Sequence, residues 1–207
     1  KGYPAPMDFD KTPWLNGFKA AGLSFDKIDY VFCTHLHIDH CGWNTVLRDG
    51  RWVPTFPKAR YIFSKREYDY WAAENAKTPI PQIADSVIPI IEAEQAELVA
   101  DDHALDDLVR LEPTPGHTPN HVAVHVGKGD ARAVMTGDLI HSPLQARYPE
   151  ISMFSDFDPA QSAVTRRRFL ESCCDTGTLM CMAHFPSPSA GRLTRWGEGY
   201  RLVCDPA

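Results

Sequence analysis

The sequence predicts a layered α/β fold that occupies residues 1–207 as a single domain. Short apolar runs rich in β-branched and aromatic residues, typical of buried strands, alternate along the chain with segments of helical pattern. Of the 207 residues, 43% are hydrophobic and 23% are charged, which are the proportions of a globular protein with its own core. No repeat, low-complexity tract or linker divides the chain, so we expect one domain.

The first predicted elements are an arm and two strands. Residues 1–24 contain several prolines and glycines, and we expect an irregular N-terminal arm with a short helix. Residues 29–34 (DYVFCT) and 59–63 (ARYIF) are short, apolar and rich in aromatic and β-branched side chains. Both runs therefore predict buried strands.

Two helical regions follow the second strand. Ser64 is the expected N-cap of a helix over residues 65–75, and Glu67, three residues on, completes a capping box. Residues 79–99 are mostly helical in composition, although two prolines interrupt them. We therefore expect helices throughout this region.

The C-terminal half is expected to contain several strands and one long helix before the last of them. Residues 121–126 alternate strictly, with three valines on one face, and a Gly-Lys-Gly-Asp turn leads into 131–136, which predicts a hairpin. Asp158 followed by proline predicts the start of a helix that runs to about Cys173. Further strands are expected at 108–111 and 178–183.

The charge of the chain argues against some partners. The net charge is −6, and the one dense basic run is Arg166-Arg167-Arg168, which is expected to form the solvated face of a helix. No apolar run approaches the ~18 residues of a membrane span. We therefore expect no nucleic-acid or membrane partner and a small-molecule substrate, with homodimerisation as an open alternative.

The six cysteines form no CxxC pair, and Cys33 and Cys181 lie in strand-like runs, so buried free thiols are expected. This predicts a reducing compartment and a cytoplasmic location. Because the chain begins at Lys1, an upstream signal segment stays an open alternative.

A dense group of metal-binding residue types follows the first strand. His35, His37, Asp39 and His40 form an HxHxDH pattern, a density of imidazole and carboxylate that a core does not need. Two residues apart on extended backbone, His35 and His37 project to the same side and can share one cation. Asp39 and His40 follow a turn and can reach a second cation. The alternative is a histidine-containing surface loop.

Three more candidate ligands each follow a predicted strand. They are His117 in a Pro-Gly-His-Thr loop, Asp138 after a glycine, and His184 after the last core strand. Each alone is as well explained by a turn or a core histidine. In layered α/β folds, however, ligand-binding residues gather at strand ends, so the joint pattern predicts one site.

These motifs, in this order, resemble the metallo-β-lactamase-fold hydrolases. The resemblance runs from about Phe25 to Leu193 and rests on HxHxDH, on GHT at 116–118, on GD at 137–138 and on AHF at 183–185. It implies an αββα sandwich with a dinuclear metal site between two sheets.

The resemblance also assigns the ligands. His35, His37 and His117 would hold one metal, Asp39, His40 and His184 the other, and Asp138 would bridge them. Zinc is the expected occupant of both sites, and iron, manganese or cobalt suit the same ligand types.

Residues 41–44 and 137–143 look most like the lactonase and organophosphate-hydrolase branch of the family. The acyl-homoserine lactonases typically carry a tyrosine where this chain has His141, and Asn120 replaces a glycine of the GHTPGH element, where asparagine tolerates left-handed backbone. Only 34 residues precede His35. We therefore expect that the fold lacks its N-terminal strands, that the chain is truncated upstream, and that one sheet has an exposed edge.

The expected function is a dinuclear metal-dependent hydrolase in which a bridging hydroxide attacks the carbonyl of a lactone or small hydrophobic ester. Asp39 would orient the water and move its proton, and His141 would donate a hydrogen bond to the substrate or leaving group, or else only stabilise its loop. The alternatives are a phosphotriester hydrolase, then a thioester hydrolase or β-lactamase. A diiron redox or metal-binding module is the non-enzyme alternative.

Specificity is expected to depend on an apolar pocket over the metals. Trp43, three residues after His40, is the candidate for one wall. Leu144 and Phe154, in the loop after His141, are candidates for the opposite wall.

Overall fold

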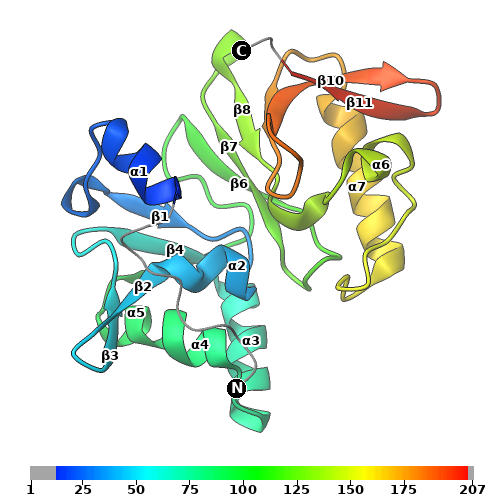
Figure 1. Ribbon diagram of the computed structural model, residues 1–207. Coiled ribbons are helices and arrows are strands. Elements are labelled where there is room, and N and C mark those ends of the chain that lie inside the picture. Colours follow the sequence, from blue (N-terminus) through cyan, green and yellow to red (C-terminus); the bar gives the residue numbers. More distant parts are fainter. Residues whose placement is uncertain (1–12, 205–207) are drawn as a thin grey trace.

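Two β-sheets pack face to face, and helices cover the outer face of each, in the computed structural model, which describes residues 13–204 (Figure 1). An apolar cluster lies between the sheets and includes Ile62, Val99, Leu111, Val122 and Val124. The described residues therefore form the αββα sandwich that the sequence motifs implied.

The smaller sheet has three parallel strands in the order β1 (Tyr30–Phe32), β4 (Arg60–Ser64) and β5 (Ala96–Val99). Alternation along β4 places Ile62 between the sheets, whereas Tyr61 and Phe63 belong to the cluster on the other face. That cluster includes residues of α4 (Pro81–Ser86) and α5 (Ile88–Glu92), and α3 (Lys65–Lys77) follows β4 directly.

The larger sheet has six strands in the order β11-β10-β9-β8-β7-β6. All neighbours are antiparallel except β8 and β9. The long helix α7 covers its outer face, where Phe169 and Leu170 join a cluster with Ala123 and Val134. The bounds are β6 (Val109–Pro113), β7 (Val122–Val126), β8 (Ala133–Met135), β9 (Leu179–Cys181), β10 (Ala190–Trp196), β11 (Gly199–Val203) and α7 (Pro159–Cys173).

Short elements complete the described chain. They are α1 (Pro13–Ala20), α2 (Ile38–Cys41), α6 (Pro143–Arg147), the hairpin β2 (Thr45–Arg48) and β3 (Arg51–Pro54), and 3₁₀ turns at Phe25–Lys27, Gly42–Asn44, Gly129–Ala131 and Gly137–Leu139. The helix α1 is the short helix expected in the N-terminal arm, and the rest of the arm before residue 13 lies outside the described residues.

Several expected elements are confirmed and others are corrected. The strands at 29–34, 59–63, 108–111 and 178–183, the hairpin at 121–136 and the helix from Asp158 are all found, with small shifts at their ends. The helical expectation for 79–99 is wrong at its end, because residues 96–99 form β5. Pairing with the buried strand β4 overrides the local helical composition there. The β2–β3 and β10–β11 hairpins were not expected.

The free cysteines agree with the sequence, whereas the expected loss of N-terminal strands stays a prediction. Among residues 13–204, β1 pairs with β4 alone and forms an edge of the smaller sheet. All six cysteines are free, with Cys33 buried and Cys181 partly buried. In the part of the chain that the structure describes, no helix combines the length and the apolar character that crossing a membrane requires.

Candidate metal centre

The HxHxDH residues follow β1 at the end of the sandwich. His37 has extended backbone and stands at the N-cap of α2, His35 lies in a bend just before it, and the last two motif residues, Asp39 and His40, lie within the helix. This change of backbone direction separates the motif into two pairs, as its spacing predicted.

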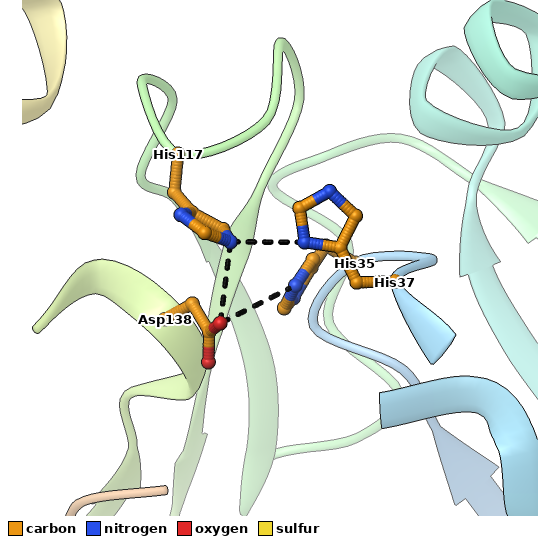
Figure 2. A group of neighbouring side chains, drawn as sticks. All are labelled: His35, His37, His117 and Asp138. Carbon is orange, nitrogen blue, oxygen red and sulfur yellow. Dashed lines mark hydrogen bonds and ion pairs between the residues drawn. The ribbon is translucent and has the colours of Figure 1, made fainter. Parts of the chain in front are cut away.

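The first candidate ligand set consists of His35, His37, His117 and Asp138, whose potential ligand atoms all lie within 4.8 Å of one another. Nε2 of His117 lies 3.0 Å from Nδ1 of His37 and 3.2 Å from Oδ2 of Asp138 (Figure 2). Nε2 of His35 lies 3.7 Å from the same carboxylate oxygen. His35, His117 and Asp138 are all buried.

The second set consists of Asp39, His40, Asp138 and His184. Oδ1 of Asp138 lies 2.8 Å from Nε2 of His40 and 3.1 Å from Nε2 of His184. Both imidazoles lie 3.4 Å from Oδ2 of Asp39. The side chains of Asp39 and His184 are 52% and 36% exposed, so this set is open to solvent on one side.

The donor atoms fit divalent cations. Nε2 of His35 is buried without a hydrogen-bond partner, although Nδ1 of the same ring lies 3.1 Å from the hydroxyl of Thr34. A buried imidazole nitrogen without a hydrogen-bond partner costs free energy, and a bound cation would remove that cost. Two sets of imidazole and carboxylate groups joined by one aspartate match the ligand types of zinc and similar metals.

The candidate histidines differ in protonation. Burial lowers the pKa of His35 well below its ordinary value and that of His37 to about 4, so both rings are neutral at pH 7 and keep lone pairs. For His40, burial is outweighed by hydrogen bonds with Asp138 and Asp39, which raise its pKa to about 9. For His117, burial is outweighed by hydrogen bonds with Asp138 and Asp156, which raise its pKa, so a metal would compete with protons for these two rings.

Burial raises the pKa of Asp138, but hydrogen bonds with His117, His141 and His40 outweigh it and hold that pKa far below its usual range. Asp138 is therefore a carboxylate with each oxygen directed at a different group of histidines.

His141 also lies at the centre. Its Nε2 is 3.1 Å from Oδ2 of Asp138, and its ring stacks on that of His184, with centroids 5.1 Å apart and planes at 9°. The sequence placed His141 near the reacting groups, and the structure brings it to the same carboxylate as the candidate ligands.

The predicted pocket residues lie in different surroundings. The ring of Trp43 packs on that of Trp14, with centroids 4.3 Å apart. Leu144 is 55% exposed and Phe154 is 98% exposed. A cavity of about 290 Å³ beside His40 is lined by other residues, including Cys33, Met135 and Met182. The assignment of Trp43, Leu144 and Phe154 to a substrate pocket stays a prediction.

Glu67 has a role that the sequence did not reveal. Ser64 caps α3 by accepting the backbone N–H of Glu67, as expected, but the Glu67 carboxylate does not close a capping box. It is buried and accepts the backbone N–H of Leu36 and of Asn120, so it links the two loops that carry His35 and His117. Asn120 does not adopt the left-handed backbone considered for it.

A buried arginine corrects a second expectation. Arg166 is fully buried in α7, whereas Arg167 and Arg168 are exposed as a solvated helix face should be. Its partner Asp156, also buried, contacts Nδ1 of His117. Neither residue was among the candidates from the sequence.

Comparisons with known proteins show the family and relatives of the chain. The family model described as the metallo-beta-lactamase superfamily matches residues 7–172. An N-acyl homoserine lactonase of Bacillus thuringiensis is 22% identical over 171 residues, which cover 83% of this chain. One from Bacillus sp is 26% identical over 121 residues, 58% of this chain. The chain spans 61% and 42% of the lengths of these two relatives.

Solved structures share the fold. The crystal structure of the hydrolase AbOPH, in the beta-lactamase superfamily, superposes with a TM-score of 0.81 at 25% identity, covering 93% of this chain and 69% of that one. AidC, a dizinc quorum-quenching lactonase in complex with a product, superposes with a TM-score of 0.77 at 23% identity over the same shares of the two chains.

Proposed function

The chain belongs to the metallo-beta-lactamase superfamily, and from this we propose that it is a hydrolase that uses two divalent cations to open a lactone or a small hydrophobic ester. The observation that carries the proposal is the position of Asp138. Its Oδ2 faces His35 and His117, and its Oδ1 faces His40 and His184. A carboxylate whose two oxygens face different groups of ligands is suited to bridging two cations.

The proposed ligands are those of the two sets. His35, His37 and His117 would hold one cation, Asp39, His40 and His184 the other, with Asp138 shared. Zinc is the proposed metal, and iron, manganese or cobalt are the alternatives that elemental analysis distinguishes. When bound, such a pair supplies Lewis acidity that lowers the pKa of a shared water and polarises the carbonyl.

Asp39 is suited to handle the water's proton. A hydrogen bond with His40 keeps the pKa of Asp39 below its ordinary value, so this side chain is a carboxylate at neutral pH. It is half exposed on the open side of the second set. There it can accept a hydrogen bond from the attacking water and hold it toward the substrate.

His141 is proposed as the donor to the substrate or leaving group. Its Nε2 lies 3.1 Å from Oδ2 of Asp138, and its ring stacks on that of His184, which is partly exposed. A His141→Phe variant keeps a flat ring but removes the N–H. We expect a lower kcat with the metal content unchanged, whereas an unchanged kcat would limit His141 to a structural role.

The substrate class is supported by the relatives. The proteins similar in sequence are N-acyl homoserine lactonases, and AidC was solved with a product, N-hexanoyl-L-homoserine, bound. Both descriptions concern lactonases that act on acylated homoserine compounds. We therefore propose a carbonyl substrate and treat phosphotriester, thioester and β-lactam hydrolysis as outcomes that an assay separates.

The test is metal removal followed by a substrate panel. After chelation and dialysis, the protein should hydrolyse none of a γ-lactone, an aryl ester, a phosphotriester, a thioester or a β-lactam. Adding back zinc to two equivalents should restore hydrolysis, fastest for the lactone or ester. Full activity in protein shown by elemental analysis to be metal-free would refute the proposal. A yellow-brown protein containing iron and inactive on the panel would favour a redox centre instead.

A further inference from the structure

A buried carboxylate binds the ring of His117 on the side away from the candidate metal centre. Oδ1 of Asp156 lies 3.0 Å from Nδ1 of His117, and both side chains are at most 1% exposed. Because a carboxylate only accepts, Nδ1 carries the hydrogen and donates it. With Nδ1–H held by Asp156, the neutral ring can offer the lone pair of Nε2 to a cation on the side that faces His37 and Asp138.

The backbone around Asp156 is attached to the same loop. The N–H of Phe157 donates to the carbonyl of His117, and the N–H of Asp158 donates to the carbonyl of Gly116. Gly116 has a φ of +136°, and a Cβ there would lie 2.4 Å from backbone atoms of Ser162 in α7. The loop that carries His117 is therefore held closely against the start of α7.

Arg166 extends this contact to the loop that carries Asp138. Its guanidinium lies 3.5 Å from Oδ2 of Asp156 and donates to the carbonyl of Leu139 at 2.7 Å. It also donates to the carbonyls of Pro149 and Ile151 and to the hydroxyl of Ser162. Leu139 directly follows Asp138. The side chain of Arg166 therefore contacts both the backbone next to Asp138 and the carboxylate that binds His117.

We infer that Asp156 and Arg166 are positioning residues of the metal centre, which fix the ring of His117 and the loop of Asp138 in the arrangement that receives the cations. This inference rests on the proposed function, because it needs a metal at the centre. Carboxylates that accept the second N–H of a ligating histidine fix its tautomer and strengthen metal binding about 10–100-fold.

A matched pair elsewhere in the chain supplies the control. Glu112 accepts a hydrogen bond from Nε2 of His125 at 2.8 Å on the larger sheet, and neither residue belongs to the candidate ligand sets. Glu112→Gln therefore removes the charge from a carboxylate–histidine pair without touching the metal centre.

The experiment measures zinc affinity with a competing chelator, and the visible spectrum of the cobalt-loaded protein, for wild type, Asp156→Asn and Glu112→Gln. We expect Asp156→Asn to bind one cation about 10–100-fold more weakly, with a changed cobalt spectrum, and to hold the other nearly as wild type does. Glu112→Gln should match wild type in both measurements. Circular dichroism of the metal-free proteins checks that both variants fold.

A second variant covers the outcome in which Asp156→Asn does not fold. Arg166→Lys keeps the charge opposite Asp156 but cannot reach the carbonyls of Leu139, Pro149 and Ile151 together. It should weaken zinc binding several-fold, with a changed cobalt spectrum.

The results separate the inference from the proposed function. Wild-type affinities and spectrum in folded Asp156→Asn would overturn the role of Asp156, and the same result in Arg166→Lys would overturn that of Arg166. A wild-type protein that binds no cation would overturn the proposed function and this inference with it.

Discussion

The backbone N–H of Asp138 donates a hydrogen bond to Nε2 of His121 at 3.0 Å. His121 is fully buried, and burial lowers its pKa to about 3, so the ring is neutral at pH 7. Its Nδ1 lies 2.8 Å from the hydroxyl of Thr114 and donates to it, because Nε2 is already the acceptor. His121 therefore orients the loop of Asp138 and belongs to neither candidate ligand set.

Gly137→Ala should destabilise the protein and weaken the metal centre. Gly137 has a φ of +50°, and a Cβ there would lie 2.5 Å from the hydroxyl oxygen of Thr34 and 2.6 Å from Nε2 of His121. We expect a loss of about 2–4 kcal/mol in the free energy of unfolding of the metal-free protein, measured with urea.

Gly22→Ala is the matched control for this change. Gly22 has a φ of +73° but nothing within 4 Å of an added Cβ. The free energy of unfolding of Gly22→Ala should fall by only ~1–2 kcal/mol, the cost of placing alanine in left-handed backbone. Equal losses in the two variants would show that the contacts with Thr34 and His121 carry no cost.

Asp138→Asn should separate the two cations. An amide offers one acceptor oxygen, so it cannot serve both groups of histidines as the two carboxylate oxygens do. We expect fewer than two zinc ions per chain by elemental analysis and a loss of activity of at least about 100-fold. Asp106→Asn, in a turn where one side-chain oxygen accepts two backbone N–H groups, is the control. Two firmly bound zinc ions and full activity in Asp138→Asn would contradict the bridging role.

Glu67→Gln should loosen the connection between the two ligand loops. Oε1 accepts Nε1–H of Trp71 at 2.7 Å and the N–H of Leu36 at 3.4 Å, while Oε2 accepts the N–H of Asn120 at 3.1 Å. A glutamine must direct its NH₂ at one of these donors, which should cost about 1–3 kcal/mol.

Hydrogen exchange at the amides of Leu36 and Asn120 is the direct measurement for Glu67→Gln, and at least one of them should exchange faster. Glu74→Gln, on the same helix and paired with Lys77, should change stability by less than about 0.5 kcal/mol. Unchanged exchange at both amides would remove the linking role of Glu67.

The pair of Glu112 and His125 should give a pH-dependent term in stability. The hydrogen bond with His125 lowers the pKa of Glu112 below its ordinary value of 4.5. Its contribution is therefore complete above pH 4.5 and is lost as the pH falls through the lower pKa of the folded state. Because the pair is partly exposed, the free energy of unfolding of wild type should exceed that of Glu112→Gln by only about 1 kcal/mol at pH 7. Urea titrations should show this difference shrinking below pH 4.5. A difference that grows in acid would contradict this assignment.

The proposed ligands could be predicted from the sequence because local spacing and strand ends determine where they lie. His35 and His37 lie two residues apart in the loop after β1, and His117, Asp138 and His184 each come after a strand of the larger sheet. Close spacing in the chain and a position just after a strand are properties that the sequence displays directly.

The supporting residues could not be predicted in the same way, because their partners are distant in sequence. Glu67 and Asp156 are charged residues whose burial follows only from loops that meet in three dimensions. Arg166 did carry a signal. It falls four residues after Ser162 and three or four before Phe169 and Leu170, on the buried stripe of α7, so helical periodicity places it inward.

The ligands of each set come from segments that lie far apart in the chain, from His35 to His184, and this order has a consequence for synthesis. A nascent chain that has passed Asp138 already contains every donor of the first set, whereas the second set is incomplete until His184 leaves the ribosome. A cation held by the proposed second set would then join α2 to the loop after β9. Such a cross-link favours the folded chain over any partly opened form, so metal supply and resistance to proteolysis should rise together.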